Sequence, residues 1–124
     1  MKKNVRYIVV HSTKTLPEEM CFAAQYHYII HRNGDVEKSK RLADDDSCVQ
    51  IAYLGGIDNE RKICDTKTVP QSESLFNLLI ALTEKYAEAK IVGADEIFGA
   101  TNDPGFNVRD WLKNYTPQIL KEAA

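Results

Sequence analysis

The chain has 124 residues, of which 44% are hydrophobic and 27% charged, so we expect one compact domain, residues 1–124, around one core. Sixteen basic against eighteen acidic residues give a formal net charge of -2, which does not favour a nucleic-acid-binding surface. The apolar stretch near the N-terminus is short and no small-residue cleavage site follows it, which predicts a cytoplasmic chain without a signal peptide or membrane span. Three cysteines without a C-x-x-C spacing are typical of reduced thiols: Cys21, Cys48 and Cys64.

The predicted elements mix strands and helices, which indicates an α/β fold. Residues 5–10 are mostly apolar and β-branched, as in a strand covered on both faces, so we expect a central strand. Residues 25–40 predict a hairpin, with Asn33 and Gly34 in a type I′ turn that needs positive φ at both positions. Residues 49–54 predict another short strand.

A glycine pair, Gly55-Gly56, follows that strand and lets the backbone turn without a Cβ penalty. The clearest helical pattern covers residues 69–88, where leucines recur on one face. Thr68 is expected to cap this helix, and Gln71 three residues later completes a capping box.

The remaining elements are short. Residues 89–96 predict a returning strand, and residues 108–115 predict a last helix that packs through Trp111 and Leu112. No internal repeat or linker divides the chain, so the prediction of one α/β domain covers its whole length.

Six motifs occur in a fixed order between about residues 6 and 112: IVVHSTKT, YHYIIHRNGDVEK, IAYLGGID, the stretch from DTKTVPQ through the leucine-rich helix, IVGADE and DPGFNVRDWL. In this order they resemble the zinc-dependent N-acetylmuramoyl-L-alanine amidase family, whose fold is shared by bacteriophage lysozyme-type amidases and peptidoglycan recognition proteins. The resemblance implies a central mixed β-sheet flanked by helices, with a zinc ion in a cleft on one side.

The resemblance also implies a zinc site with two histidines, a third ligand that is cysteine or aspartate, and a fourth position for water. His11 matches the first ligand, and Asp103 before Pro-Gly matches the third. Ala94 stands where the family has its second histidine, and a methyl group cannot coordinate a metal. We therefore expect an incomplete zinc site and a hydrolase that is weak or inactive. Without the motif series, His11 would be a satisfied strand-end histidine and Asp103 a turn residue.

Other residues are candidates for the missing ligand. In an extended segment Glu96 shares the face of Ala94, whereas Asp95 faces the opposite side. Cys48 or Cys64 is a further candidate from a loop, and the spacing favours neither.

The resemblance assigns two catalytic positions. Tyr26 matches a tyrosine that assists the tetrahedral intermediate, and Thr101 replaces a lysine that stabilises the oxyanion, offering a hydrogen bond without a charge. Alternatively, Tyr26 is a sheet aromatic that alternates onto one face with Tyr28. His27 and His31 are expected to be structural or solvated.

The segments that wall the cleft in the family are short here. Residues 16–25 and 41–48 leave little room for such walls, so we expect a shallow or rebuilt substrate groove. The acidic run Asp44-Asp45-Asp46 is expected to be a solvated loop, because it lacks the interleaved ligands of a calcium site.

Three functions fit these observations. The first is an active zinc amidase that cleaves between the lactyl group of muramic acid and L-alanine. The second is a non-catalytic relative that binds peptidoglycan or a muramyl-peptide fragment, and the third is a module that binds a protein partner. The missing ligand favours the two non-catalytic functions over the active amidase. The resemblance makes peptidoglycan the best single target. Neither nucleic acid nor a membrane is an expected partner, and a cytoplasmic chain would reach the wall at host lysis or through a phage-type export route.

Overall fold

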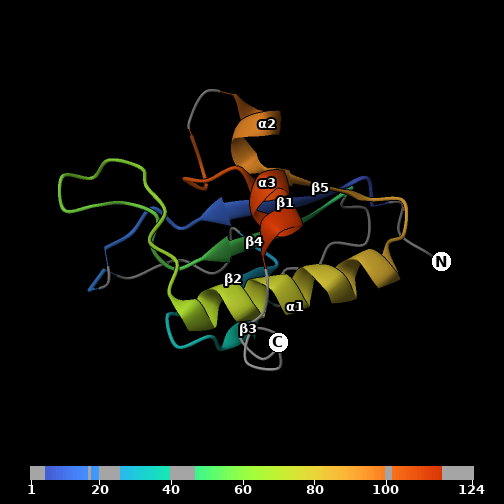
Figure 1. Cartoon of the computed structure of the whole chain (residues 1–124), viewed down its shortest axis with the longest axis horizontal. Coiled ribbons are helices and arrows are strands. Elements are labelled where there is room, and N and C mark those ends of the chain that lie inside the picture. The colour runs from blue at the N-terminus through green and yellow to red at the C-terminus, as the bar shows by residue number, and fades with distance from the viewer. Residues whose placement is uncertain (1–4, 17, 20–25, 40–46, 100–101, 116–124) are drawn as a thin grey trace.

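The computed structural model describes residues 5–16, 18–19, 26–39, 47–99 and 102–115 (Figure 1). Its elements in chain order are β1 (Tyr7–Ser12), β2 (Tyr28–Ile30), β3 (Val36–Lys38), β4 (Cys48–Tyr53), α1 (Val69–Lys85), β5 (Lys90–Gly93), α2 (Ala94–Phe98) and α3 (Val108–Asn114). No helix within these ranges is both long and apolar enough to span a membrane.

The strands form one sheet in the order β3-β2-β4-β1-β5. β1 pairs in parallel with β4 and β5 on its two sides, which confirms the predicted central strand. β2 is parallel to β4, whereas β3 is antiparallel to β2, so the sheet is mixed. The predicted α/β class with a mixed sheet and flanking helices is confirmed.

The β2–β3 hairpin is confirmed, but its predicted turn type is wrong. The turn is closed by the Gly34 amide, which donates to the His31 carbonyl at 2.8 Å. Gly34 has a φ of 96°, and Asn33 has no positive φ. The side chain of Asn33 accepts instead from the amide of Asp35 at 2.9 Å. This hydrogen bond from the Asp35 amide to the Asn33 side chain stabilises the turn without a positive φ at Asn33. Gly34 is therefore the one residue of the two that adopts the left-handed conformation.

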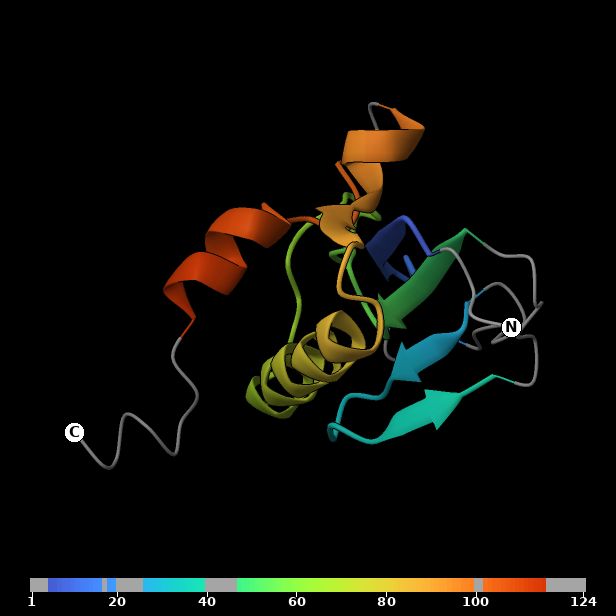
Figure 2. The same ribbon diagram turned by 90° about the vertical axis from the view of Figure 1, so that its right-hand side faces the viewer.

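Helix α1 lies along one face of the sheet (Figures 1 and 2). Its predicted cap is confirmed: Thr68 Oγ1 accepts from the Gln71 amide at 3.2 Å, and Gln71 Oε1 accepts from the Thr68 amide at 2.9 Å. The helix ends at Lys85, and Tyr86 serves as its C-cap, slightly earlier than the pattern predicted.

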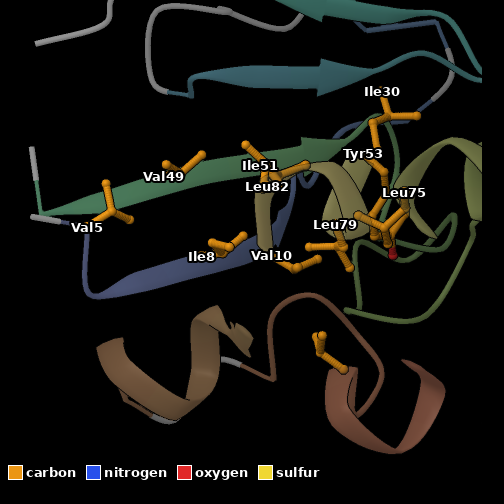
Figure 3. Packing of buried hydrophobic residues seen from close by; sticks show 11 residues of the cluster. Val5, Ile8, Val10, Ile30, Val49, Ile51, Tyr53, Leu75, Leu79 and Leu82 are labelled. Carbon is orange, nitrogen blue, oxygen red and sulfur yellow. The ribbon is translucent and has the colours of Figure 1, made fainter. Parts of the chain in front are cut away.

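The main core lies between α1 and the sheet (Figure 3). Side chains of β1 and β4 meet the buried leucines of α1 there, and the predicted packing residues Trp111 and Leu112 of α3 join the edge of this cluster. The fully buried or nearly buried members include Ile8, Val10, Ile30, Val49, Ile51, Tyr53, Leu75, Leu79 and Leu82. Because this cluster covers the face of the sheet toward α1, a functional site on β1 must lie on the opposite face or at the ends of the strands.

The predicted strand over residues 89–96 is only partly right. β5 ends at Gly93, and α2 begins at Ala94. The Glu96 carboxylate accepts from the Gly93 amide at 2.8 Å, which satisfies an N-terminal amide of the helix. The chain therefore turns away from the sheet at the position where the family resemblance places its second histidine.

Candidate functional site

His11 lies near the carboxyl end of β1, on the face of the sheet away from α1. Alternation along β1 puts Ile8 and Val10 in the core under α1, while Val9 packs in a second cluster with Val92 and Ala94. His11 shares the side of Val9. The imidazole is largely buried, with a side-chain exposure of 12%.

The structure brings Asp103 to His11. Asp103 Oδ2 lies 3.4 Å from His11 Nδ1. Its other oxygen, Oδ1, accepts from the amide of Ser12 at 2.8 Å and from the Ser12 hydroxyl at 2.9 Å. Burial opposes ionisation of this carboxyl, but the hydrogen bonds from His11 and Ser12 outweigh it and hold the pKa of Asp103 below its usual range. Asp103 is therefore an ionised, buried hydrogen-bond acceptor at neutral pH.

The loop that carries Asp103 is fastened to the core. The hydroxyl of Tyr53, a buried residue of β4, donates to the carbonyl of Pro104 at 2.8 Å. Gly105 has a φ of 94°, and a Cβ there would lie 2.6 Å from the carbonyl carbon of Cys64. Only glycine fits this close backbone contact, so the loop can approach the sheet closely enough to reach His11.

Lys67 holds the next part of the same loop. Its Nζ lies 3.4 Å from the centre of the Phe106 ring and 2.7 Å from Asp65 Oδ2. Burial lowers the pKa of Lys67, although the hydrogen bond to Asp65 acts in the opposite direction. This buried cation–π contact ties the segment before α1 to the segment before α3.

The second ring nitrogen of His11 is also engaged. His11 Nε2 lies 2.7 Å from Gln50 Oε1, an amide oxygen that accepts a hydrogen bond. The backbone of Gln50 in turn pairs with His27. The backbone amide of Gln50 donates to His27 Nδ1 at 2.8 Å, and the backbone carbonyl of Gln50 accepts from the backbone amide of His27 at 2.8 Å. His27 is 1% exposed and extends the pairing between β2 and β4, in agreement with a structural role. Sequence reasoning missed Gln50, although a lone polar residue among the apolar residues of β4 was an available signal.

Lys14 is a second residue that sequence reasoning missed. Its Nζ lies 3.9 Å from Asp103 Oδ2, and its side chain is 46% exposed. The backbone at Lys14 is left-handed, with a φ of 58°, and its amide donates to the Gly55 carbonyl at 2.8 Å. The available signal was a lysine three positions after the candidate histidine.

Two aromatic rings flank His11. The Tyr26 ring lies 5.2 Å from the imidazole at an interplanar angle of 56°, and the Phe98 ring of α2 lies 5.9 Å away in a stacked arrangement. β2 begins only at Tyr28, so Tyr26 is not part of the alternation that would make it a sheet aromatic. Tyr26 therefore lies just before the strand that was expected to include it, with its ring beside the imidazole, and its catalytic role stays a prediction. Thr101, the other predicted catalytic residue, lies outside the described residues, as does the Asp44-Asp45-Asp46 run.

The alternative metal donors do not complete a metal site among the described residues. Glu96 accepts from the Gly93 amide and pairs with Arg109, so the extended geometry that put it on the face of Ala94 does not apply. Cys48 and Cys64 are free thiols, and no group of three His, Cys, Asp or Glu side chains suited to a metal occurs among the described residues. In the described part of the chain, the donor set therefore does not fit the three-ligand zinc site that the resemblance implies.

A shallow cavity of about 440 Å³ opens near the same carboxyl edge of the sheet. The residues that line it come from the segments directly after β2 and β4: His31, Arg32, Asn33, Asp35 and Leu54. His31 is paired with Glu37 at 2.9 Å, with both side chains substantially exposed, which agrees with a solvated histidine.

Comparison with known proteins gives two similar sequences from bacteriophages. The chain is 30% identical over 94 residues to the endolysins of Enterobacteria phage T3 and Escherichia phage T7, a match that covers 69% of this chain and 62% of each relative. The chain thus spans less than two thirds of the length of these relatives. No family model matches it.

Solved structures of the same fold include one from a phage, one from a bacterium and one from an insect. The endolysin of Thermus scotoductus bacteriophage Ph2119 matches with a TM-score of 0.68 and 21% identity, covering 87% of this chain and 82% of its own. The amidase LysC of Clostridium intestinale gives 0.57 and 22%, covering 84% and 78%, and bumblebee PGRP-SA gives 0.60 and 16%, covering 92% and 83%. By sequence this chain is similar to phage endolysins, and its fold is the one seen in a phage endolysin, the N-acetylmuramoyl-L-alanine amidase LysC and a peptidoglycan recognition protein.

Proposed function

We propose that this chain is a peptidoglycan-directed domain that binds muramyl-peptide fragments on the face containing His11 and hydrolyses them weakly or not at all. The observation that carries the proposal is the approach of Asp103 Oδ2 to within 3.4 Å of His11 Nδ1, with the Tyr26 ring beside the imidazole, in a chain similar to endolysins. The name of LysC as an N-acetylmuramoyl-L-alanine amidase supports the same target.

The proposed roles follow from the chemistry of each side chain. Tyr26 and Thr101 carry hydroxyl groups, which we assign as hydrogen-bond donors to the carbonyl oxygen of the bound amide. We assign His11 and Asp103 to the two positions of the family's metal site that this chain retains. Two protein donors fall short of the three that zinc hydrolases use, which is why we expect binding to exceed hydrolysis.

The proposal treats residues 1–124 as one amidase-like domain that meets the wall when a host cell lyses or when the chain is exported. Binding of a protein partner is a second candidate function. It is favoured by two exposed apolar side chains of α2, Ile97 at 37% and Phe98 at 56%, of which Phe98 stacks on His11.

Co-sedimentation of the purified chain with insoluble peptidoglycan tests the proposal. We expect the wild type to sediment with the wall material and the His11→Ala variant to bind roughly tenfold more weakly, a loss of about 1.4 kcal/mol. Lys85→Ala, an exposed change in the last turn of α1, is the matched control and should bind like the wild type.

Two results would contradict the proposal. Absence of wild-type chain from the sedimented wall would remove peptidoglycan as the ligand. Release of free L-alanine amino termini from the same material, at a rate comparable to that of an active endolysin, would contradict the weak or absent hydrolysis.

A further inference from the structure

We propose that Lys14 is the resident cation of this site, so that a lysine ammonium group takes the place of a metal ion beside Asp103. The inference concerns the site of the proposed function and rests on it only for the identification of this face as the ligand-binding one. Its evidence is the set of contacts around Asp103 and His11.

Three residues of the described chain place polar groups around the Asp103 carboxylate: His11, Ser12 and Lys14. Ser12 donates two hydrogen bonds to Oδ1, while Oδ2 faces His11 Nδ1 at 3.4 Å and Lys14 Nζ at 3.9 Å. The Asp103 side chain is 4% exposed, and a carboxylate buried to this degree requires compensating charge and hydrogen bonds. Lys14 supplies a full positive charge on the oxygen atom that also faces His11.

Lys14 is held in place by its backbone. Its amide donates to the Gly55 carbonyl at 2.8 Å, and the preceding residue, Thr13, donates its amide to the Tyr53 carbonyl at 3.0 Å. The left-handed φ of 58° at Lys14 is uncommon for a residue with a side chain. The end of β1 is therefore tied to the end of β4 in a conformation that directs this lysine toward Asp103.

Gln50 completes the arrangement from the other side of the imidazole. His11 Nε2 is 2.7 Å from Gln50 Oε1, so this nitrogen is paired with an oxygen acceptor. An oxygen acceptor at Nε2 keeps a proton on that nitrogen, as it does for histidines that bind a metal through the other ring nitrogen. Gln50 therefore orients the imidazole so that Nδ1 faces Asp103, and the group that opposes a metal ion at Asp103 is the Lys14 ammonium.

A consequence is that a histidine at position 94 does not by itself restore zinc binding. A divalent cation on Asp103 Oδ2 would lie within a few ångströms of the Lys14 ammonium, and like charges at such a distance repel strongly. Removing the lysine charge should remove this competition.

Zinc binding measured by isothermal titration calorimetry tests the inference. We compare Ala94→His with Ala94→His/Lys14→Met, and independently compare the wild type with Lys14→Met, so that the test does not depend on the tolerance of position 94. Loss of the Lys14 charge should strengthen zinc binding at least about tenfold in both pairs. Lys14→Arg keeps the charge and should bind zinc no better than its parent.

Lys62→Met is the matched control, because Lys62 is an exposed lysine paired with Glu60, and it should leave zinc affinity unchanged. Circular dichroism confirms that each variant is folded. Equal zinc affinity with lysine or methionine at position 14 would overturn the inference, as would sub-micromolar zinc binding by the wild type. Neither result bears on the peptidoglycan sedimentation, so the inference and the proposed function can fail separately.

Discussion

Asp103 links the two ends of the chain at the site. It is 2% exposed and accepts hydrogen bonds from Ser12, a residue 91 positions earlier. Burial alone would raise the pKa of Asp103, but hydrogen bonds from His11 and Ser12 lower it below its ordinary value. The ionised form of this carboxyl therefore stabilises the folded chain.

The Asp103→Asn variant should lower the free energy of unfolding by about 1.5–3 kcal/mol at pH 7, because it removes the charge that these donors stabilise. The pKa of folded Asp103 lies below the ordinary value of 3.8, so its contribution is complete above that value and is lost as pH falls through the lower, folded pKa. Urea unfolding of both proteins from about pH 7 to about pH 2 should therefore show a difference that shrinks at the acid end.

Asp110→Asn is the control for this series, because Asp110 is exposed on α3. A difference between the wild type and Asp103→Asn that stays constant down to the lowest pH would show that the charge of Asp103 does not stabilise the fold.

Gln71, a buried polar residue in the first turn of α1, bonds this helix to the sheet. Gln71 is 0% exposed, and its Nε2 donates to the carbonyls of Ile30 at 3.1 Å and Leu54 at 3.0 Å. Its Oε1 accepts from the Thr68 amide in the capping box. One side chain thus caps the helix and binds the carboxyl ends of β2 and β4, which border the edge where the site lies.

Gln71→Met keeps the length of the side chain and removes all three hydrogen bonds. We expect a loss of about 2 kcal/mol in the free energy of unfolding, because buried backbone groups lose their partners. Thermal and urea unfolding measure the change. Glu84→Met, on the exposed side of the same helix, should stay within about 0.5 kcal/mol of the wild type. Equal effects of the two variants would contradict the anchoring role of Gln71.

Tyr53 connects the core to the loop that carries Asp103. Its ring belongs to the core beneath α1, and its hydroxyl donates to Pro104, the residue after Asp103. Burial, together with the nearby negative charge of Asp65, raises the pKa of this phenol, so it remains a protonated donor. The position of the Asp103 loop therefore depends on the packing of the whole sheet.

A double-mutant cycle tests this link. Tyr53→Phe should cost about 1–2 kcal/mol of unfolding free energy, and its effect should be coupled to that of Asp103→Asn by at least about 0.5 kcal/mol, because both changes loosen the same loop. Leu82→Ala removes a buried side chain of α1 and should be additive with Asp103→Asn within about 0.5 kcal/mol. Additivity in both cycles would show that Tyr53 does not position the loop.

The sequence by itself determined the features that arise from local patterns. The β-branched run predicted the central strand, Thr68 and Gln71 predicted the capping box, and the glycine after Asn33 predicted the hairpin, all of which the structure contains. The order of the motifs identified the fold and singled out His11 and Asp103, which the structure brings to 3.4 Å. These features follow from hydrogen bonds and side-chain periods that span only a few residues, or from a motif series that the chain still carries.

Only the tertiary structure decided which side chains from separate elements meet. The chain starts a helix at Ala94 because Glu96 bonds to the amide of Gly93, and that contact turns Glu96 away from the site. Gln50 and Lys14 reach His11 and Asp103 because β1, β4 and the Gly55 turn are packed side by side. Such contacts join residues far apart along the chain, and no local pattern records them, since they depend on the packed position of whole elements.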